Sequence, residues 1–163
     1  MVLFAATGEG QAEGGLKKKI TAFLIDKGTK GFTVRDGYRS VSHRGYHNSI
    51  LEFDDCRVAA STVLGDEHLG FDVANEWLSA TRLQIAASCV GRGQRALELC
   101  TECGANRRQF GQAIGKFQGT SFKLADMAME WKAAELLTLE TAWRLDQGSM
   151  RDQDAAMAKL YAT

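Results

Sequence analysis

The chain has 163 residues, which suits one domain or a small domain together with part of a second. Lys and Arg total 20, as do Asp and Glu, so the net charge is zero and gives nucleic-acid binding little support. No apolar run is long enough to span a bilayer, and the short apolar N-terminus lacks the basic flank of a signal peptide. We therefore expect a globular protein with no membrane span, in a reducing, cytoplasmic compartment.

Residues 1–64 have the pattern of short strands. The runs "VLFAAT", "ITAFLID" and "FTVRD" are separated by turn-like segments, and "SILEFDD" alternates so that it could present one dry face and one wetter face. The stretch "GEGQAEGGLKKK" predicts a glycine-rich hairpin loop, and "KGTKG" predicts a turn. Four or five strands with short turns predict a partial antiparallel sheet, too small to close its own core.

From about Gly65 to Gly104 the apolar period becomes that of a long helix. Small residues, among them Gly91 and Gly93, would let another backbone approach closely, at a cost of roughly 1 kcal/mol per glycine relative to alanine. Seven positions follow the i, i+3, i+4 spacing of a helix: Phe71, Ala74, Leu78, Thr81, Ile85, Ser88 and Cys89.

A second helix is predicted from about Lys116 to Gln147, and it carries two apolar stripes. The first stripe is Leu124, Met127, Ala128, Trp131, Ala134, Ala142 and Leu145, and the second is Phe122, Met129, Ala133, Leu136, Leu139 and Trp143. A helix that is apolar on most sides packs inside a bundle or at a subunit interface. Gly148 is a plausible C-cap, and a third helix begins in "SMRDQDAAMAKLYAT".

Together these patterns predict an α+β fold. A partial antiparallel sheet in residues 1–64 precedes the long antiparallel helices of a four-helix-bundle-type domain in residues 65–163. Because the third helix runs to the last residue, we expect the chain to be part of a larger protein.

Cysteine spacing offers one possible chemical motif. Cys100 and Cys103 form a C-x-x-C pair, which could indicate redox chemistry or metal binding. No second ligand pair stands at zinc spacing, and the three histidines are scattered. The interpretation we favour is that the cysteines are ordinary helix residues and that there is no metal site.

The stretch "NRRQFGQAIGKFQG", residues 106–119, joins the two long helices. The helix dipole favours Arg107 and Arg108 at a helix C-terminus, and Gly111 supplies a turn, so a plain connection explains part of the pattern. The same residues would also suit a pyrophosphate beside a planar ring. Arginine binds phosphate in a fork, Phe110 offers an aromatic contact, and the Gln118 amide both donates and accepts.

Three segments then resemble a known family. "NRRQFGQAIGKFQGTSFKLADMAME" resembles the signature R-x-x-F-G-x-x-I-x-x-F-Q…LADM of the flavin-dependent acyl-CoA dehydrogenase family. "HRGYHNSILEFDDCRVAASTVLGDEHLGF" is similar to its F-x-D-V-x-V-P…G-F segment, with Cys56 and Ala59 in place of valine and proline. "ATRLQIAASCVGRGQRALELC" is similar to the arginine-bearing helix that follows. The resemblance covers roughly residues 20–163.

This resemblance implies an FAD flavoprotein built from a helical domain, a β-domain and a four-helix C-terminal domain, and assembled as a homo-oligomer, a dimer or tetramer. Residues 1–64 would be the later part of the β-domain. Arg107 matches the arginine that contacts the FAD pyrophosphate of a neighbouring subunit. Phe110 matches the aromatic beside the adenosine half, and Gln118 matches a glutamine that reaches the same part of FAD.

The implied reaction is α,β-dehydrogenation of an acyl-CoA thioester, with electron-transfer flavoprotein as the acceptor. Arg82 matches a helix arginine near the thioester and its CoA arm; an intrahelical ion pair with Glu76 or Glu98 is the alternative. No catalytic base can be assigned, because Thr81 stands where a minority of members carry glutamate and the usual position lies beyond Thr163. We therefore expect this chain alone to be inactive.

Two kinds of alternative stay open. Acyl-CoA oxidases, nitroalkane oxidases and alkylation-response proteins look similar through the same segments. A non-enzymatic helical interaction module with a β-extension is the other alternative. Flavin absorbance and fluorescence separate the module from the enzymes, because the module is expected to bind no FAD under any condition.

Overall fold

The computed structural model describes residues 1–12 and 15–163, which form two compact units, Met1–Asn75 and Glu76–Thr163. Antiparallel strands come first and three α-helices follow, so the predicted α+β fold is confirmed. Helix α1 (Gly70–Asn106) begins in the first unit and continues through the second.

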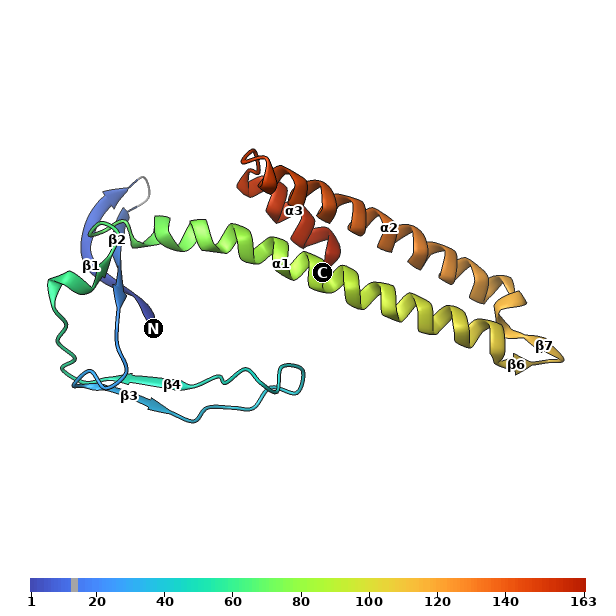
Figure 1. Cartoon of the computed structure of the whole chain (residues 1–163), viewed down its shortest axis with the longest axis horizontal. Helices are drawn as coiled ribbons and strands as arrows, with labels where there is room; N and C mark the ends of the chain where they lie inside the picture. Colours follow the sequence, from blue (N-terminus) through green and yellow to red (C-terminus); the bar gives the residue numbers. More distant parts are fainter. Residues whose placement is uncertain (13–14) are drawn as a thin grey trace. The chain divides into compact units, whose positions relative to one another are not determined.

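The main sheet of the first unit has the order β1-β2-β5, with all pairs antiparallel (Figure 1). Its strands are β1 (Val2–Ala12), β2 (Gly15–Leu24) and the short β5 (Val63–Leu64). The predicted long hairpin loop in residues 8–19 is wrong, because Gly8 and Gly10 pair with Lys19 and Lys17 as ladder residues. The tip of that predicted loop, residues 13 and 14, lies outside the described residues.

A second, two-stranded sheet pairs β3 (Phe32–Arg35) with β4 (Ile50–Phe53). Phe32 lies opposite Phe53, and their rings stack with centroids 5.0 Å apart. The dry face expected on residues 50–53 is not found, since every residue of β4 is exposed. A two-stranded ribbon buries little on either face, so alternation in the sequence does not by itself produce a covered side.

The start of α1 is held tightly against β2. Thr21 is fully buried, and its hydroxyl lies 2.5 Å from the Thr7 hydroxyl and accepts a 2.8 Å hydrogen bond from the His68 amide. A Cβ added to Gly70 would lie 2.4 Å from the amide nitrogen of Ala22. Only glycine allows this approach, so the strand fixes where the helix begins.

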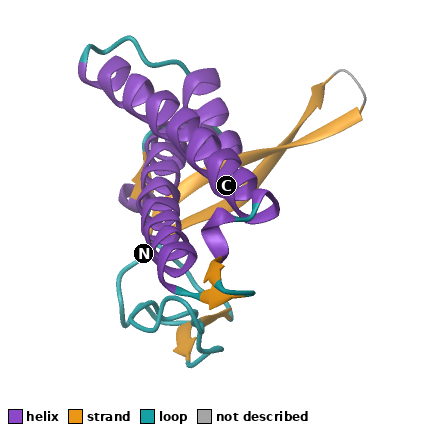
Figure 2. Cartoon of the chain, turned by 90° about the vertical axis from the view of Figure 1, so that its right-hand side faces the viewer, coloured by secondary structure: helices purple, strands orange, loops and turns teal. Residues whose placement is uncertain are grey.

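In the second unit, α1 and α2 (Gln118–Asp146) form an antiparallel hairpin, and α3 (Asp152–Ala162) returns beside α2 (Figure 1). Figure 2 shows the three helices side by side from another direction. The indole Nε1 of Trp131 donates a 3.0 Å hydrogen bond to the Val90 carbonyl. A Cβ on Gly93 would lie 3.2 Å from the same indole, so this glycine does permit close approach, whereas Gly91 faces open space.

The buried residues of α1 are not those that showed the helical spacing in the sequence. Ser79, Leu83 and Ala86 are buried, whereas Phe71 is 60% exposed and Ile85 is 40% exposed. The spacing predicted the helix, but it does not select the buried side, because α1 carries apolar residues on more than one face.

Helix α2 uses only one of its two apolar stripes within the described chain. Ala134, in the first stripe, is buried, together with the neighbouring Thr138 and Thr141. The five large residues of the second stripe are between 56% and 66% exposed: Phe122, Met129, Leu136, Leu139 and Trp143. The helix therefore has the broad apolar surface of a bundle or interface helix, as predicted.

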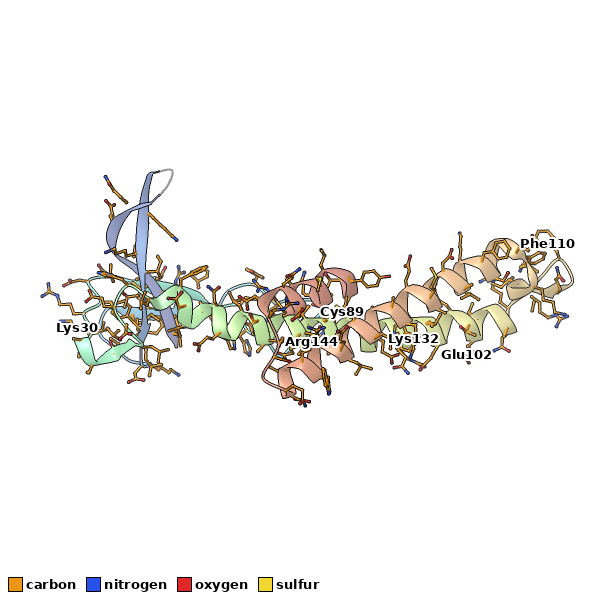
Figure 3. The ribbon with its side chains drawn as sticks, turned by 90° about the horizontal axis from the view of Figure 1, so that it is seen from above. Lys30, Cys89, Glu102, Phe110, Lys132 and Arg144 are labelled. Atoms are coloured by element: carbon orange, nitrogen blue, oxygen red, sulfur yellow. The ribbon has the colours of Figure 1, made fainter. Side chains whose placement is uncertain are left out.

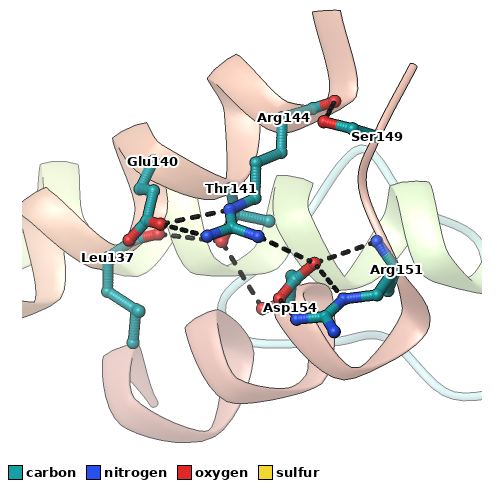
Figure 4. A network of polar contacts seen from close by, with 7 residues as sticks. All are labelled: Leu137, Glu140, Thr141, Arg144, Ser149, Arg151 and Asp154. Atoms are coloured by element: carbon teal, nitrogen blue, oxygen red, sulfur yellow. Dashed lines mark hydrogen bonds and ion pairs between the residues drawn. The ribbon is translucent and has the colours of Figure 1, made fainter. Parts of the chain in front are cut away.

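An ion network around the buried Asp154 carboxylate joins α3 to α2 (Figure 4). The Asp154 carboxylate is almost fully buried and accepts hydrogen bonds from the Arg151 amide at 3.0 Å and from its guanidinium at 3.1 and 3.2 Å. Arg144 lies 3.8 Å from the same carboxylate and also binds Glu140 at 2.6 Å. The hydrogen bonds from Arg151, first from its side chain and then from its backbone, lower the pKa of Asp154 below its ordinary value. Gln147, and not the predicted Gly148, is the C-cap of α2, and Gly148 follows it with a left-handed φ of 64°.

Candidate functional site

The connection between α1 and α2 is a tight hairpin. Strands β6 (Arg108–Gln109) and β7 (Gln112–Ala113) pair across the two-residue turn Phe110-Gly111. Both turn residues are left-handed, with φ of 51° and 79°. Such a turn normally takes Asn or Asp at its first position, so Phe110 is held there at a cost of roughly 1–2 kcal/mol.

The Phe110 side chain is displayed to solvent. It is 92% exposed and touches Phe117 only edge to face, with ring centroids 6.3 Å apart. Figure 3 shows it at the far tip of the helical hairpin. A large apolar ring that is both strained and exposed adds little to folding, so the arrangement suits contact with a ligand or a partner.

Arg107 has a fixed backbone and a free side chain. Its amide donates to the Cys103 carbonyl at 2.9 Å, and its carbonyl accepts from the Ile114 amide at 2.9 Å. The side chain is exposed, and its guanidinium has no hydrogen bond or ion pair within the described residues. Arg108 differs, because its guanidinium donates to the Gly111 carbonyl at 3.3 Å. The donors of Arg107 are therefore available to an anion.

Gln118 is the exposed first residue of α2. The N-cap Phe117 supplies no side-chain hydrogen bond, and the first turn holds no acidic residue. Residues 106–118 contain three basic side chains and no acidic one. Open helix amides next to these bases favour an anion at this end of α2.

A close contact between Gly104 and Gly115 holds the two ends of the connection between α1 and α2 together. A Cβ on Gly115 would lie 2.9 Å from the Gly104 carbonyl oxygen, so the last turn of α1 packs directly on the 3-10 turn η2 (Ile114–Lys116). Arg107, Phe110 and Gln118 consequently lie at the same end of the helical hairpin.

Arg82 lies elsewhere. It is half-buried on α1, 24 residues before the end of the helix, which corresponds to about 36 Å at 1.5 Å per residue. The structure therefore does not bring it together with the other three. In the described part of the chain it forms no ion pair with Glu76 or Glu98, and Glu98 pairs with Arg95 at 3.0 Å instead.

The described residues show no other candidate centre for the chemistry. The Thr81 hydroxyl donates to the Trp77 carbonyl at 2.9 Å, so it is occupied by its own helix. No group of three metal-ligating side chains occurs in residues 1–12 and 15–163, and all four cysteines are free thiols. Across the same residues, no helix has the length and apolar character needed to cross a membrane.

Sequence reasoning missed two features near these residues. Buried Ser79, one turn before Arg82, donates a hydrogen bond to the carboxylate of Asp152 at the start of α3. The two residues are 73 positions apart, and nothing in the spacing signals the pair. The strain at Phe110 had a signal, because F-G stands where a two-residue hairpin turn usually has N-G or D-G.

Comparisons with known proteins identify the family of the chain. The family model for the acyl-CoA dehydrogenase C-terminal domain matches residues 68–163, more than half of the chain. The probable acyl-CoA dehydrogenase YngJ of Bacillus subtilis is 37% identical over 163 residues, which is all of this chain and 42% of YngJ.

Solved structures lead to the same family. Butyryl-CoA dehydrogenase from Megasphaera elsdenii aligns with 99% of this chain and 41% of its own, with a TM-score of 0.83 and 36% identity. The prolyl acyl carrier protein oxidase AnaB aligns with 99% of this chain and 42% of its own, with a TM-score of 0.84 and 31% identity. The chain thus spans about two fifths of the length of these relatives. The match to the family model and the likeness to the solved enzymes confirm the resemblance: the chain belongs to the acyl-CoA dehydrogenase family.

Proposed function

We propose that the parent protein is an FAD-dependent dehydrogenase that performs α,β-dehydrogenation of acyl-CoA thioesters. In this proposal, residues 1–64 belong to its β-domain and residues 65–163 are the first helices of its C-terminal domain. The observation that carries the proposal is the hairpin after α1, which holds both Phe110, with a left-handed backbone and a ring that is 92% exposed, and the guanidinium of Arg107, unpaired within the described residues.

The hairpin residues would hold FAD that is seated mainly in a neighbouring subunit. Arg107 would form a fork with pyrophosphate oxygens, and the open amides of α2 would add to the positive field. Phe110 would contact the adenosine half, and the exposed Gln118 amide would bind the same portion. FAD, when bound, supplies the acceptor for the β-hydride of the substrate.

Arg82 is proposed to contact the acyl-CoA thioester and its CoA arm. Arg82 is half-buried on α1 and, in the described chain, its guanidinium has no carboxylate partner. The neighbouring Ser79–Asp152 hydrogen bond ties this stretch of α1 to α3, which would keep the arginine in place. None of the 163 residues is proposed as the base that removes the α-proton, and the chain alone is proposed to be inactive.

The partners in this proposal are acyl-CoA, electron-transfer flavoprotein as the electron acceptor, and further copies of the chain in a dimer or tetramer. The exposed second stripe of α2 supports self-association, because such a surface is unfavourable in water unless covered. A cytoplasmic location remains part of the proposal.

An oxidase is the second candidate. The likeness to AnaB, named as an oxidase of a carrier-protein substrate, favours it. Hydrogen peroxide release with oxygen as sole acceptor would identify an oxidase, whereas turnover only with electron-transfer flavoprotein would identify a dehydrogenase. No comparison reported above favours nitroalkane oxidation or the non-enzymatic helical module. The catalytic base that would distinguish a nitroalkane oxidase from a dehydrogenase is not assigned to any described residue.

The proposal is tested on the purified parent protein. We expect the absorbance and fluorescence of bound flavin, and we expect anaerobic addition of an acyl-CoA to bleach the flavin absorbance. A parent protein that binds no FAD under any condition would support the helical module instead. Bound flavin that no acyl thioester reduces would move the assignment to another flavin reaction.

A further inference from the structure

Two free thiols, Cys100 and Cys103, lie on exposed turns of α1 just before the hairpin. They are three residues apart, and Arg107 follows Cys103 by four, so the three positions share one helical face. Figure 3 places Glu102, which stands between the two cysteines, near the Phe110 end of the helices. The proposed function gives this C-x-x-C pair no role.

Helix geometry brings the two cysteines within reach of each other. Residues three apart in an α-helix have Cα atoms about 5 Å apart, inside the range of roughly 4.4–6.8 Å that a disulfide needs. Their Cβ atoms are about 5–6 Å apart, whereas a disulfide needs roughly 3.5–4.5 Å. A bond between them is therefore feasible only if the turn that carries them tightens by about 1–2 Å.

That turn is the one that holds the hairpin. The Cys103 carbonyl accepts the hydrogen bond from the Arg107 amide, and the Arg107 carbonyl accepts from Ile114, each at 2.9 Å. Gly104, directly after Cys103, is buried, and a Cβ added to the facing Gly115 would lie 2.9 Å from the Gly104 carbonyl oxygen. A displacement of Cys103 is therefore expected to shift the adjoining segment that carries Arg107 and Phe110.

We propose that Cys100 and Cys103 are a redox-sensitive dithiol whose oxidation to an intrahelical disulfide loosens the end of α1. The oxidant is a low-molecular-weight disulfide. One cysteine thiolate attacks it and releases a thiol, and the second thiolate then displaces the other half from the mixed disulfide. Two cysteine thiols are oxidised, one external disulfide is reduced to two thiols, and the two protons leave on those thiols. Because the helix strains the new bond, external thiols reduce it readily.

The first measurement asks whether the bond forms. The folded chain is equilibrated in reduced and oxidised glutathione, quenched in acid and digested with trypsin. Peptide 96–107, "ALELCTECGANR", holds both thiols and no other cysteine. We expect a mass loss of about 2 Da without a glutathione adduct, reversed by dithiothreitol. An unchanged mass, or adducts on single cysteines only, at every glutathione ratio would overturn the proposal.

The second measurement asks whether the bond has the stated effect. Hydrogen exchange at the Arg107 and Ile114 amides should become about tenfold faster on oxidation, because their hydrogen bonds open more often. Amides in the middle of α3 should not change. The Cys100→Ser variant, under the same oxidant, should show neither the mass loss nor the faster exchange. Oxidised protein with unaltered exchange at both amides would overturn the proposal.

The effect on cofactor binding rests on the proposed function of Arg107 and is measured in the parent protein. Oxidation should lower FAD retention in the parent, but not in its Cys100→Ser variant. If exchange rises on oxidation while FAD retention stays constant, the dithiol stands and the role of Arg107 fails. If Arg107→Ala lowers FAD retention but no disulfide forms, the role of Arg107 stands and the dithiol fails.

Discussion

Phe110 adopts an unfavourable backbone conformation and leaves its ring exposed to water. Its φ of 51° is unfavourable for any residue with a bulky side chain, and the ring is 92% exposed. At the scale of a single residue, this conflict between local preference and structure points to a site selected for contact with something outside the described chain.

Replacing Phe110 with Asn should therefore separate stability from binding. We expect Phe110→Asn to stabilise the chain by about 1 kcal/mol, since Asn adopts the left-handed region more readily, and to weaken FAD retention in the parent. Urea unfolding measures the first effect and flavin content after gel filtration the second. Lower stability together with full flavin content would contradict both halves of this expectation.

Arg107 is tested against an arginine on the same helix. Loss of its charge-assisted contact should cost about 1.5–3 kcal/mol, so Arg107→Ala should weaken FAD binding by roughly 10- to 150-fold. Arg92 is also exposed on α1, and Arg92→Ala should leave FAD affinity unchanged. Equal FAD affinity in the two variants, measured by fluorescence titration, would remove Arg107 from the site.

At the scale of elements, the position of the hairpin depends on the contact between α1 and η2. Gly115→Ala places a Cβ 2.9 Å from the Gly104 carbonyl, and we expect a loss of roughly 1–3 kcal/mol in the free energy of unfolding. Gly119→Ala is the matched control, because a Cβ there meets open space near the start of α2. It should be neutral or stabilising by up to about 1 kcal/mol. Equal urea midpoints for the two variants would show that the backbone can yield at Gly115.

The junction of α2 and α3 should be sensitive to acid. The native pKa of Asp154 lies below its ordinary value because of hydrogen bonds from Arg151, so its stabilising contribution is complete above about pH 4. As the pH falls below that, the unfolded state takes up the proton first and stability declines until the native carboxylate is also protonated. Asp154→Asn should lose stability at pH 7 and show a flatter acid limb in urea unfolding between pH 2 and pH 7. Asp126→Asn, at an exposed site on α2, should keep the acid limb unchanged.

At the scale of the whole molecule, we expect the second stripe of α2 to mediate assembly. Its five large side chains are more than half exposed, and water disfavours a continuous apolar face of this kind. We expect the parent protein to be a dimer or tetramer, and Leu136→Glu with Leu139→Glu to lower its mass in sedimentation. Lys123→Glu, on the same helix but outside the stripe, should not change the mass. A monomeric parent at micromolar concentration would contradict the expectation.

The helices and the connection between them follow from the sequence because helical spacing, Gly148 and the R-x-x-F-G pattern are local signals. The buried side of α1 could not be chosen, because Leu83 and Ile85 suit opposite faces equally well. Residues 8–12 looked like a loop because their glycines are turn formers, although the ladder with Lys17–Lys19 overrides that preference. The Ser79–Asp152 and Gly104–Gly115 contacts depend on tertiary packing, which no local pattern encodes.

Arg82 lies on the uninterrupted helix α1, and Arg107 follows directly after the last residue of that helix. Deleting or inserting a single residue between them would turn one guanidinium by about 100° around the axis relative to the other and shift it by about 1.5 Å. Length changes in this stretch preserve the mutual orientation of the two arginines only when they come close to whole turns, as with seven residues for two turns. The number of residues between Arg82 and Arg107 is thus constrained by helix geometry, separately from any constraint on which side chains α1 carries.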